Sequence, residues 1–430
     1  HDIVCKIAAI VVVGGVRRSA LISLSDLNDE EMRTAKSGQW WEREGQRALA
    51  NNSVNYKEKP NVGTFMREWL SLYDSKSGER GMYNGASAKT QVEKLNEREK
   101  DENQEFIKRR EPREDFGTNP CSEIILRSRE FCNLSECIVR RHDTTESLIK
   151  KVRIATILGT FQSTLTNFRY LTKEWERNCS DERLLGVSLT GILDNPLTSG
   201  RKKGLDELLQ TLRKVAVDTN KEWSSKLGVK RSAAITCVKP SGTVSQLVDS
   251  ASGIHARHSE YYIRTVRADN KDPLCQMMKQ SGFPNEPDVT KPNHTTVFSF
   301  PTESPKGAIC RTDMTAIEQL KLWSSYQEHW CEHKPSITVT VKDQEWPEVG
   351  SWVWENFDDI SGISFLPFSD HTYRQAPYQD CTKNEYEEMS KLIPKDVDWT
   401  TLSKFEQQDF TSGSQELACS SDSGCEIVDI

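Results

Sequence analysis

Short apolar segments of strand length alternate with amphipathic segments of helical spacing through most of this 430-residue chain. Residues 183–191 and 362–366 form short apolar runs, whereas residues 204–227 and 317–330 repeat apolar side chains at helical spacing. Strands that alternate with helices are typical of an α/β protein. We therefore predict an α/β fold, with further strands at residues 21–24, 233–238, 261–267 and 336–342 and a further helix at residues 63–73.

Charge and hydropathy narrow the class of protein. The net charge of -7 argues against a general surface for binding nucleic acid. The longest apolar run, residues 7–13, is much shorter than the roughly 20 residues that a membrane span requires, and we expect it to be a buried strand or helix. No basic leader or cleavage site precedes it. The sequence therefore predicts a cytoplasmic protein with mostly reduced thiols, bound neither to nucleic acid nor to a membrane.

The two ends of the chain predict its organisation. Residues 1–5 resemble the middle of a helix and lack an initiator methionine, so we expect the chain to be the C-terminal part of a longer protein. Residues 26–50 are predicted to be helical, and residues 88–115 are almost wholly charged or polar, as in a solvated helix or an insertion. We expect residues 1–411 to form one catalytic unit and the Ser/Gly/Asp-rich residues 412–430 to form a flexible tail.

The twelve cysteines do not follow a metal-binding pattern. No Cys-x-x-Cys pair occurs, and the eight histidines lack the spacing of zinc ligands. Cys331-Glu332-His333 is compact but has no second pair. We predict no metal site formed by side chains and interpret most of the cysteines as small buried hydrophobic residues.

One short segment combines a thiol with a carboxylate. In Asn119-Pro120-Cys121-Ser122-Glu123, Cys121 and Glu123 are two residues apart, so on an extended finger their side chains point the same way. The carboxylate could then take a proton from a substrate hydroxyl while the sulfur acts on a neighbouring atom. Asn119 shares that face and could orient the substrate. The simpler interpretation is a buried cysteine beside a surface glutamate.

Three other segments could bind or reduce a substrate. Residues 14–20 place a glycine turn beside Arg17, suited either to close approach of a ligand or to an ordinary turn with solvated arginines. Residues 240–243, Pro-Ser-Gly-Thr, follow a predicted strand and could cradle a phosphate. Cys419 and Cys425 lie in the tail and could exchange with a buried disulfide, or belong to a disordered tail or half a metal site.

Taken together, these segments resemble the ribonucleotide reductases, specifically the adenosylcobalamin-dependent (class II) ribonucleoside-triphosphate reductases. The resemblance covers essentially the whole chain and implies a ten-stranded α/β barrel with a radical cysteine on a central finger loop. It implies adenosylcobalamin as cofactor, a ribonucleoside triphosphate as substrate and a deoxynucleotide as effector, in the synthesis of deoxyribonucleotides for DNA replication. The signatures, in the order of the family, are residues 14–20, Asn119 to Glu123, Phe131-Cys132-Asn133-Leu134, residues 240–243 and the C-terminal cysteine pair.

The same resemblance implies roles for the finger loop. Cys121 would carry the thiyl radical that abstracts the 3′ hydrogen of the ribose. Glu123 would be the general base on the 3′ hydroxyl, and Asn119 would hydrogen-bond the substrate. Cys132 would be one of two thiols that reduce the 2′ carbon and end as a disulfide. The resemblance places the other thiol upstream of this chain, and Cys5 does not stand at its position.

It also implies roles for the other segments. Cys419 and Cys425 would reduce the active-site disulfide again and would themselves be recharged by thioredoxin or a similar dithiol. Ser241, Gly242 and Thr243 would bind the substrate phosphates, and Arg17 would contact the base.

Four alternatives remain open on the sequence. A class I catalytic subunit would take its radical from a partner protein, but Tyr373 and Tyr378 are not adjacent as its tyrosine relay requires, and the spacing of Cys121 and Cys132 suits class II. An anaerobic glycyl-radical form lacks its glycyl loop and zinc cysteines here. A truncated nucleotide-binding module without turnover, or a zinc-binding scaffold built on the tail cysteines, would not be an enzyme.

Overall fold

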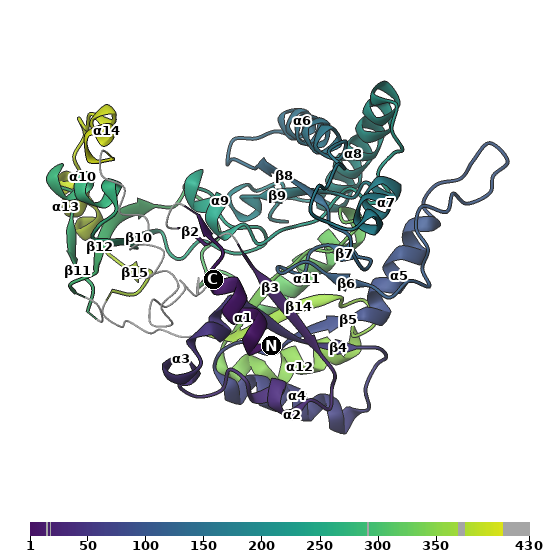
Figure 1. The fold of residues 1–430 in the computed structure, drawn as a ribbon, viewed down its shortest axis with the longest axis horizontal. Coiled ribbons are helices and arrows are strands. Elements are labelled where there is room, and N and C mark those ends of the chain that lie inside the picture. The colour runs from purple at the N-terminus through teal and green to yellow at the C-terminus, as the bar shows by residue number, and fades with distance from the viewer. Residues whose placement is uncertain (14–15, 18, 290–291, 369–374, 407–430) are drawn as a thin grey trace.

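The computed structural model describes residues 1–13, 16–17, 19–289, 292–368 and 375–406. These residues form a larger α/β body and a smaller lobe that projects from one side of it (Figure 1). Among them, no helix is both long and apolar enough to cross a membrane.

Three parallel strands form the first part of the body. β3 (Leu21–Ser25) pairs with β4 (Ala50–Tyr56), and β4 pairs with β5 (Gly81–Asn84). The predicted strand at residues 21–24 is therefore confirmed. β4 and β5 are largely buried, as expected of parallel strands covered on both faces.

The direction of the strands reverses at β5. β14 (Gly362–Pro367) pairs with β5 in antiparallel fashion and with β13 (Thr338–Val341) in parallel fashion. The five strands follow the order β13-β14-β5-β4-β3. The predicted strands at residues 336–342 and 362–366 are both confirmed.

The second parallel group continues beyond β13. β8 (Asn133–Ile138) pairs with β9 (Leu185–Thr190), whose six residues are all buried. Isolated parallel bridges join Val187 to Thr236 and Val238 to Pro335, and Pro335 leads into β13. Residues 233–238, predicted as a strand, thus connect the two sheets through single bridges. The described residues match a large part of the expected barrel but do not close it between β3 and β8.

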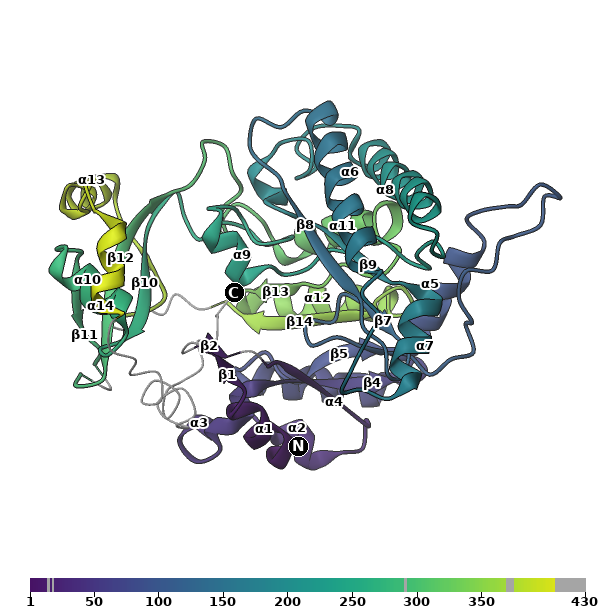
Figure 2. The ribbon, with the colours of Figure 1, turned by 45° about the horizontal axis from the view of Figure 1, so that its top comes forward.

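Amphipathic helices cover the outside of these strands (Figure 2). α6 begins with a capping box at Thr144 and Ser147 and packs on β8 and β9. α8, the predicted helix at residues 204–227, packs on α6, and α11 packs on α8 and β13. The helices of the body are α1 (Asp2–Ala9), α2 (Glu30–Thr34), α3 (Trp40–Arg43), α4 (Val62–Ser75), α5 (Gly85–Asn96), α6 (Thr145–Gln162), α7 (Lys173–Glu182), α8 (Leu205–Leu227), α9 (Gly242–Leu247), α11 (Ala316–His329) and α12 (Trp346–Glu355).

Aromatic side chains fill the core between α11 and the strands. Trp323, Tyr326 and Trp330 lie on one side of α11 and are almost completely buried. The indole N–H of Trp323 donates to Pro335 O at 2.8 Å, and that of Trp330 donates to Cys237 O at 2.7 Å. Each buried polar atom therefore has a partner, and α11 is fixed to the segments that lead to the candidate site.

The smaller lobe is an antiparallel sheet with three helices beside it. Its strands follow the order β11-β12-β10-β15, and the predicted strand at residues 261–267 belongs to β10. Cys275, Phe283 and Phe298 form its small core. Its elements are β10 (Tyr261–Asp269), α10 (Pro273–Gln280), β11 (Asn285–Pro287), β12 (Thr295–Glu303), β15 (Tyr378–Asp380), α13 (Lys383–Leu392) and α14 (Leu402–Phe405).

Two sequence-based expectations about local structure are wrong, and a third is confirmed in part. Residues 7–13 are not a buried segment: Ile7 is 57 % exposed and Ile10 is 70 % exposed, because α1 turns only Cys5 and its alanines inward. Residues 26–50 form only the short helices α2 and α3 and one 3-10 turn, not a continuous helix. In residues 88–115 the helix α5 ends at Asn96 and the rest is a projecting loop, visible at the right of Figure 1.

Candidate active site

A tight hairpin carries the cysteine and the carboxylate singled out in the sequence. β6 (Gly117–Thr118) and β7 (Ile125–Leu126) pair in antiparallel fashion and hold the loop between them. The backbone N–H of Ser122 donates to Asn119 O at 2.8 Å, and that of Ile124 donates to the side-chain oxygen of Asn119 at 3.0 Å. Asn119 therefore shapes this finger loop, and its amide oxygen is already used.

The finger loop is seated on the strands of the body. Asn51, on β4, donates from Nδ2 to Pro120 O at 2.7 Å. The backbone N–H of Lys334 donates to Glu123 O at 3.1 Å. At the start of β14, a Cβ on Gly362 would overlap Ser122 Oγ and lie 3.2 Å from Ser122 O. The close approach of β14 to the loop therefore requires glycine at position 362.

His333 supports the loop and does not bind a metal. Its Nδ1 accepts the backbone N–H of Ile125 at 3.3 Å, and its Nε2 lies 3.0 Å from Leu185 O, so the partners assign the proton to Nε2. Burial lowers the pKa of His333 well below its usual range, so the ring is neutral. The described residues contain no cluster of potential metal ligands. Within the compact Cys331-Glu332-His333 segment, His333 therefore has a structural role, because both of its ring nitrogens have backbone partners.

Cys121 and Glu123 converge on one lysine. The ammonium group of Lys239 lies 3.3 Å from Cys121 Sγ and 3.6 Å from Glu123 Oε1. The predicted proximity of the two side chains is thus confirmed, but its predicted geometry is wrong. Ser122 adopts a left-handed conformation with φ of 64°, so the segment is a turn and not an extended strand.

Glu123 is a buried carboxylate without hydrogen-bond donors among the described residues. It is 0 % exposed, and neither of its oxygens has a hydrogen-bond partner there. The ion pair with Lys239 at 3.6 Å only partly offsets the cost of burying this carboxylate, because no hydrogen bond satisfies its oxygens. Unsatisfied groups of this kind are typical of functional sites, where a ligand completes the set of partners.

The two thiols near Glu123 are held in their protonated form. Desolvation, and then the charge of Glu123, raise the pKa of the Cys121 thiol, while Lys239 opposes the rise. Desolvation and Glu123 raise the pKa of Cys132 far above its usual range. Glu123 therefore acts electrostatically on both cysteines, as expected if they belong to one site. Both cysteines are free thiols.

A second lysine lies beneath the finger loop. Lys334 is 0 % exposed, and its ammonium has only distant oxygen partners, Ser361 O at 3.4 Å and Ser122 Oγ at 3.5 Å. It also lies 4.4 Å from the ring centroid of Tyr83. Burial lowers the pKa of Lys334 to about 7, although the charge of Glu123 opposes this. Lys334 therefore titrates near neutral pH in the folded protein.

Replacing Lys334 is expected to change how stability depends on pH. Above pH 7 the unfolded lysine keeps its proton and the folded one loses it, so the free energy of unfolding rises with pH toward 10.5, by up to about 1.4 kcal/mol per pH unit. Lys334→Met lacks this contribution, so between pH 7 and 8.5 its free energy of unfolding should rise less than that of the wild type. Denaturant unfolding of both proteins across that range measures the difference. Lys57→Met, which alters an exposed lysine, should keep the wild-type slope, and equal slopes in all three proteins would contradict the prediction.

β8 brings Cys132 and Glu136 to the same side of the sheet. Cys132 precedes the strand by one residue, and alternation along the strand places Leu134 and Glu136 on its face. Glu136 accepts a hydrogen bond from the hydroxyl of Ser241. Burial raises the pKa of Glu136, and Lys239 and Glu123 also act on it. The redox cysteine predicted from the sequence therefore shares its face with a carboxylate that sequence reasoning missed.

The predicted phosphate cradle is only partly free to bind a ligand. Ser241 is buried and its hydroxyl is used by Glu136, while the N–H of Gly242 donates to Pro240 O at 2.9 Å. Thr243 is exposed at the first turn of α9. A phosphate bound here would have to displace the Ser241–Glu136 contact.

The other residues predicted to act at the site are Arg17, Cys419 and Cys425. Arg17 lies at the end of β2 (Val16–Arg17), which pairs with β1 (Val12–Val13), and only its backbone is described. Cys419 and Cys425 lie outside the described residues, as does the tail predicted for residues 412–430.

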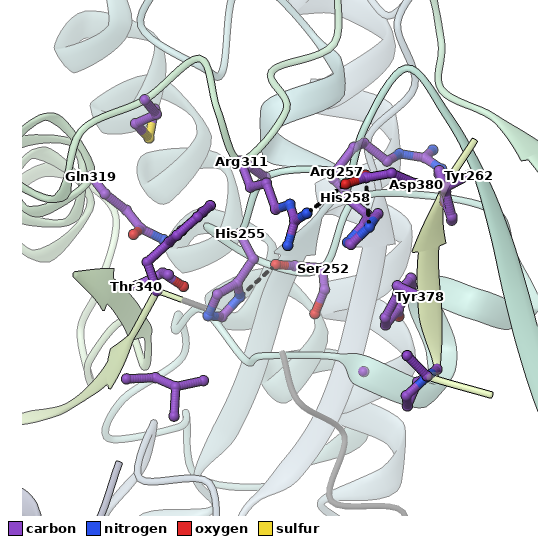
Figure 3. Close-up of a pocket in the computed structure, with 18 of the residues that line it drawn as sticks. Ser252, His255, Arg257, His258, Tyr262, Arg311, Gln319, Thr340, Tyr378 and Asp380 are labelled. Atoms are coloured by element: carbon purple, nitrogen blue, oxygen red, sulfur yellow. Dashed lines mark hydrogen bonds and ion pairs between the residues drawn. The ribbon is translucent and has the colours of Figure 1, made fainter. Parts of the chain in front are cut away.

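A cavity lies between the body and the smaller lobe, next to α9 (Figure 3). Its volume is about 630 Å³, and Gly242 and Ser245 of α9 form part of its wall. His258 stacks on Tyr378 with ring centroids 5.4 Å apart. The hydroxyls of Ser250 and Ser252 are buried and have no hydrogen-bond partner among the described residues. The cavity therefore combines flat aromatic surfaces with polar atoms that a ligand could satisfy.

Charged side chains close one side of this cavity. Arg311 donates to Asp380 at 2.9 Å, and His258 Nε2 lies 3.0 Å from the same carboxylate. Desolvation and the neighbouring Arg311 lower the pKa of His258 to about 4, so the ring is neutral near pH 7 despite Asp380. Sequence reasoning identified none of these residues, because they come from segments up to 122 positions apart, such as His258 and Asp380.

Lys239 and Lys334 are the main site residues that sequence reasoning missed. Each directly precedes a proline, in Lys239-Pro240 and Lys334-Pro335, and each follows or begins a buried segment. Proline holds the residue before it in an extended conformation, which fixes the direction of its side chain. The Lys-Pro pairs were visible in the sequence, but nothing there indicated that both lysines reach the finger loop.

Comparison with known proteins identifies the fold. No protein-family model matches the chain. A crystal structure of a B12-dependent (class II) ribonucleotide reductase superposes on 90% of this chain and 56% of its own, with a TM-score of 0.71 and 23% identity. The class Id ribonucleotide reductase alpha subunit of Actinobacillus ureae superposes with a TM-score of 0.51 and 13% identity, over 81% of this chain. The fold is therefore of the ribonucleotide reductase type.

Curated sequences show which proteins are homologous to the chain. The adenosylcobalamin-dependent ribonucleoside-triphosphate reductase of Euglena gracilis is 28% identical over 92% of this chain and 52% of its own length. That of Lactobacillus gasseri is 28% identical over 98% and 58%, and that of Lactobacillus acidophilus is 30% identical over 66% and 41%. The chain is a homologue of the adenosylcobalamin-dependent class II ribonucleotide reductases. It spans roughly half the length of the curated relatives it matches.

Proposed function

We propose that this chain carries the reducing site of an adenosylcobalamin-dependent ribonucleoside-triphosphate reductase, with Cys121 as the radical residue. The observation that carries the proposal is the convergence of Cys121 and Glu123 on Lys239, on a finger loop in a homologue of these enzymes. A hydrogen-abstracting sulfur and a proton-accepting carboxylate then stand beside one another, as removal of a hydroxyl group from a sugar requires.

The overall reaction balances with two thiols. The ribonucleotide loses its 2′ hydroxyl as water, and two thiols lose their hydrogens and form one disulfide. Cys132 is one of these thiols. The sulfur radical of Cys121 takes the 3′ hydrogen atom at the start and returns a hydrogen atom at the end, so Cys121 is regenerated and is not consumed.

Glu123 lowers the barrier to loss of the 2′ hydroxyl by taking the proton of the 3′ hydroxyl. Both of its oxygens lack donors among the described residues, so they can accept that proton without breaking an existing hydrogen bond. The carboxylate is shielded from water in this conformation. Substrate binding must therefore open a path to this carboxylate.

We assign the cofactor that the relatives use to the cavity beside α9. Its aromatic faces suit the flat corrin ring, and the unpartnered hydroxyls of Ser250 and Ser252 suit the amide groups at the rim of that ring. Tyr262, Tyr378 and His258 would form its wall (Figure 3). Adenosylcobalamin, when bound, supplies the one-electron chemistry that removes the hydrogen atom from the thiol. The protein residues bind, orient and exclude water.

The remaining roles complete the proposal. Thr243, with Ser241 and Gly242 after the Ser241–Glu136 contact opens, binds the triphosphate, and Arg17 contacts the base. A deoxynucleotide serves as effector. Cys419 and Cys425 reduce the disulfide and are recharged by thioredoxin or a similar dithiol. The ten described cysteines are free thiols, which suits a reducing cytoplasm.

The direct test is product formation by the full-length protein under anaerobic conditions. Adenosylcobalamin, a ribonucleoside triphosphate and a dithiol are supplied, and deoxynucleotide is quantified. We expect product that depends on all three components. Binding of the triphosphate without any product, with or without an added class I radical subunit, would instead identify a nucleotide-binding module without turnover.

The contact of β14 with the finger loop at Gly362 is expected to affect the rate of reduction. In Gly362→Ala the added methyl group would overlap Ser122, which would push the loop away from the strands. A displacement of about 1 Å can cost about 100-fold in rate, so we expect kcat to fall roughly 10- to 100-fold while the thermal melt changes little. Steady-state kinetics and circular dichroism measure the two effects. Gly63→Ala, where a Cβ meets only Asn61 Oδ1 at 3.5 Å, is the matched control, and an unchanged kcat in Gly362→Ala would contradict this account.

A further inference from the structure

Lys239 stands where the two chemical groups of the finger loop meet. It lies 118 residues from Cys121 in the sequence, yet its ammonium is within 3.6 Å of both the thiol sulfur and the Glu123 carboxylate. Neither Cys121 nor Glu123 has another charged group within hydrogen-bonding or ion-pairing distance among the described residues. The lysine is thus the direct link between the proposed radical residue and the proposed base.

The backbone of Lys239 is fixed from several sides. Pro240 restricts it to an extended conformation. Its N–H donates to Ser188 Oγ at 2.9 Å, on β9. On the other side Gly253 approaches so closely that a Cβ there would lie 2.8 Å from Lys239 O. The side chain therefore starts from a rigid point, and its ammonium can hold a loop that would otherwise be free to shift.

Several charged and titratable groups surround this ammonium. Glu123 and Cys121 come from the finger loop, Glu136 from β8 and Cys237 from the segment before Lys239. Beneath the loop, burial lowers the pKa of Lys334, and the charge of Glu123 opposes this. Burial alone would lower the pKa of Lys239, but Glu123 and Cys121 together raise it, so the lysine stays charged at neutral pH. A charged ammonium can donate to the sulfur and pair with the carboxylate at the same time.

We propose that Lys239 is a positioning residue of the reductase, which holds the Cys121 thiol and the Glu123 carboxylate together at one point. Because the ammonium donates to a lone pair of the sulfur, the S–H hydrogen of Cys121 remains available for transfer. The ion pair with Lys239, at 3.6 Å, keeps the Glu123 carboxylate beside that thiol. The proposal rests on the function proposed above but concerns a contact that can be measured without turnover.

The test is the pH profile of alkylation of Cys121 by iodoacetamide, followed by mass spectrometry of the peptide that contains it. Lys239 lowers the pKa of Cys121, so in Lys239→Met we expect the midpoint of the profile to rise by about one unit or more, which slows alkylation about tenfold or more at any pH below the midpoint. The midpoint, and not the maximal rate, is compared, because removing the side chain also uncovers the thiol. Lys239→Arg should keep the wild-type midpoint.

Lys151→Met is the matched control. Lys151 is also a partly exposed lysine paired with a buried carboxylate, that of Asp143, and it lies at the start of α6 away from the finger loop. Its loss should leave the Cys121 midpoint unchanged. In the reductase assay Lys239→Met should lower kcat with little change in KM, and Lys239→Arg should restore much of the loss.

The outcomes separate the two proposals. An unchanged midpoint in Lys239→Met overturns the positioning role. A raised KM with unchanged midpoint and kcat also overturns it, because Lys239 would then bind the substrate phosphates next to residues 240–243. A shifted midpoint in a protein that makes no deoxynucleotide supports the contact of Lys239 with Cys121 while the proposed function fails.

Discussion

Cys121→Ser is expected to abolish deoxynucleotide formation completely. A serine hydroxyl has nearly the same shape and can still accept the hydrogen bond from Lys239, so the finger loop should keep its structure. Its O–H bond is much stronger than the S–H bond of cysteine, however, so an oxygen radical cannot be formed and used in its place. The loss should therefore fall on kcat alone, with substrate binding retained. The anaerobic product assay and a separate measurement of triphosphate affinity test the two parts.

A second cysteine provides the comparison for this variant. Cys381 is also partly exposed, but it follows β15 in the smaller lobe, away from the finger loop. Cys381→Ser should leave the rate of product formation unchanged. If Cys121→Ser retained a substantial fraction of the wild-type rate, Cys121 could not be the radical residue and the proposed chemistry would need another sulfur.

The periodicity of the sequence predicted most regular elements of the body. The predictions for β9, α8, α11 and β14 were confirmed within a few residues, because their apolar spacing reflects burial against neighbouring layers. Residues 7–13 were wrongly expected to be buried. An apolar run shows that a segment can be buried, but it does not show whether another part of the fold packs against it.

The pairing of the strands was beyond the reach of periodicity. The reversal of direction between β5 and β14 joins residues more than 270 positions apart, and only the family resemblance suggested a barrel. The described residues show a mixed α/β fold that matches the class II reductase fold, without closure of that barrel. Long-range pairing depends on tertiary packing that no local pattern encodes.

The candidate site was predicted in its parts but not in its geometry. The sequence identified Cys121 and Glu123 as neighbours, yet through an extended finger, whereas the left-handed Ser122 makes a turn. It missed Lys239 and Lys334, because a lysine before a proline is an ordinary surface residue until the fold brings it beneath a loop. The site is therefore assembled from one local motif and two distant cations that compensate its buried charge.

The second large effect is expected in Glu123→Gln, which removes the carboxylate whose charge acts on Lys239 and Lys334. The amide cannot take the proton of the 3′ hydroxyl, and loss of a general base costs about 100- to 10,000-fold in rate. Because the amide has nearly the volume of the carboxylate, we expect KM to change little and kcat to carry the loss. Steady-state kinetics with the full-length protein, at several pH values between 6 and 8, measures this.

The same substitution should also change the charge balance of the site. Glu123 raises the pKa of Lys239 and of Lys334, so in Glu123→Gln both buried ammonium groups lose their counter-charge and the protein becomes less stable below pH 7. Glu123→Asp keeps the charge but shortens the reach, so it should keep most of the stability and lose part of the rate. Equal kcat in wild type and Glu123→Gln would show that the carboxylate balances the lysines only. The proton of the 3′ hydroxyl would then go to another group, such as Glu136 on β8, which Glu123 influences electrostatically.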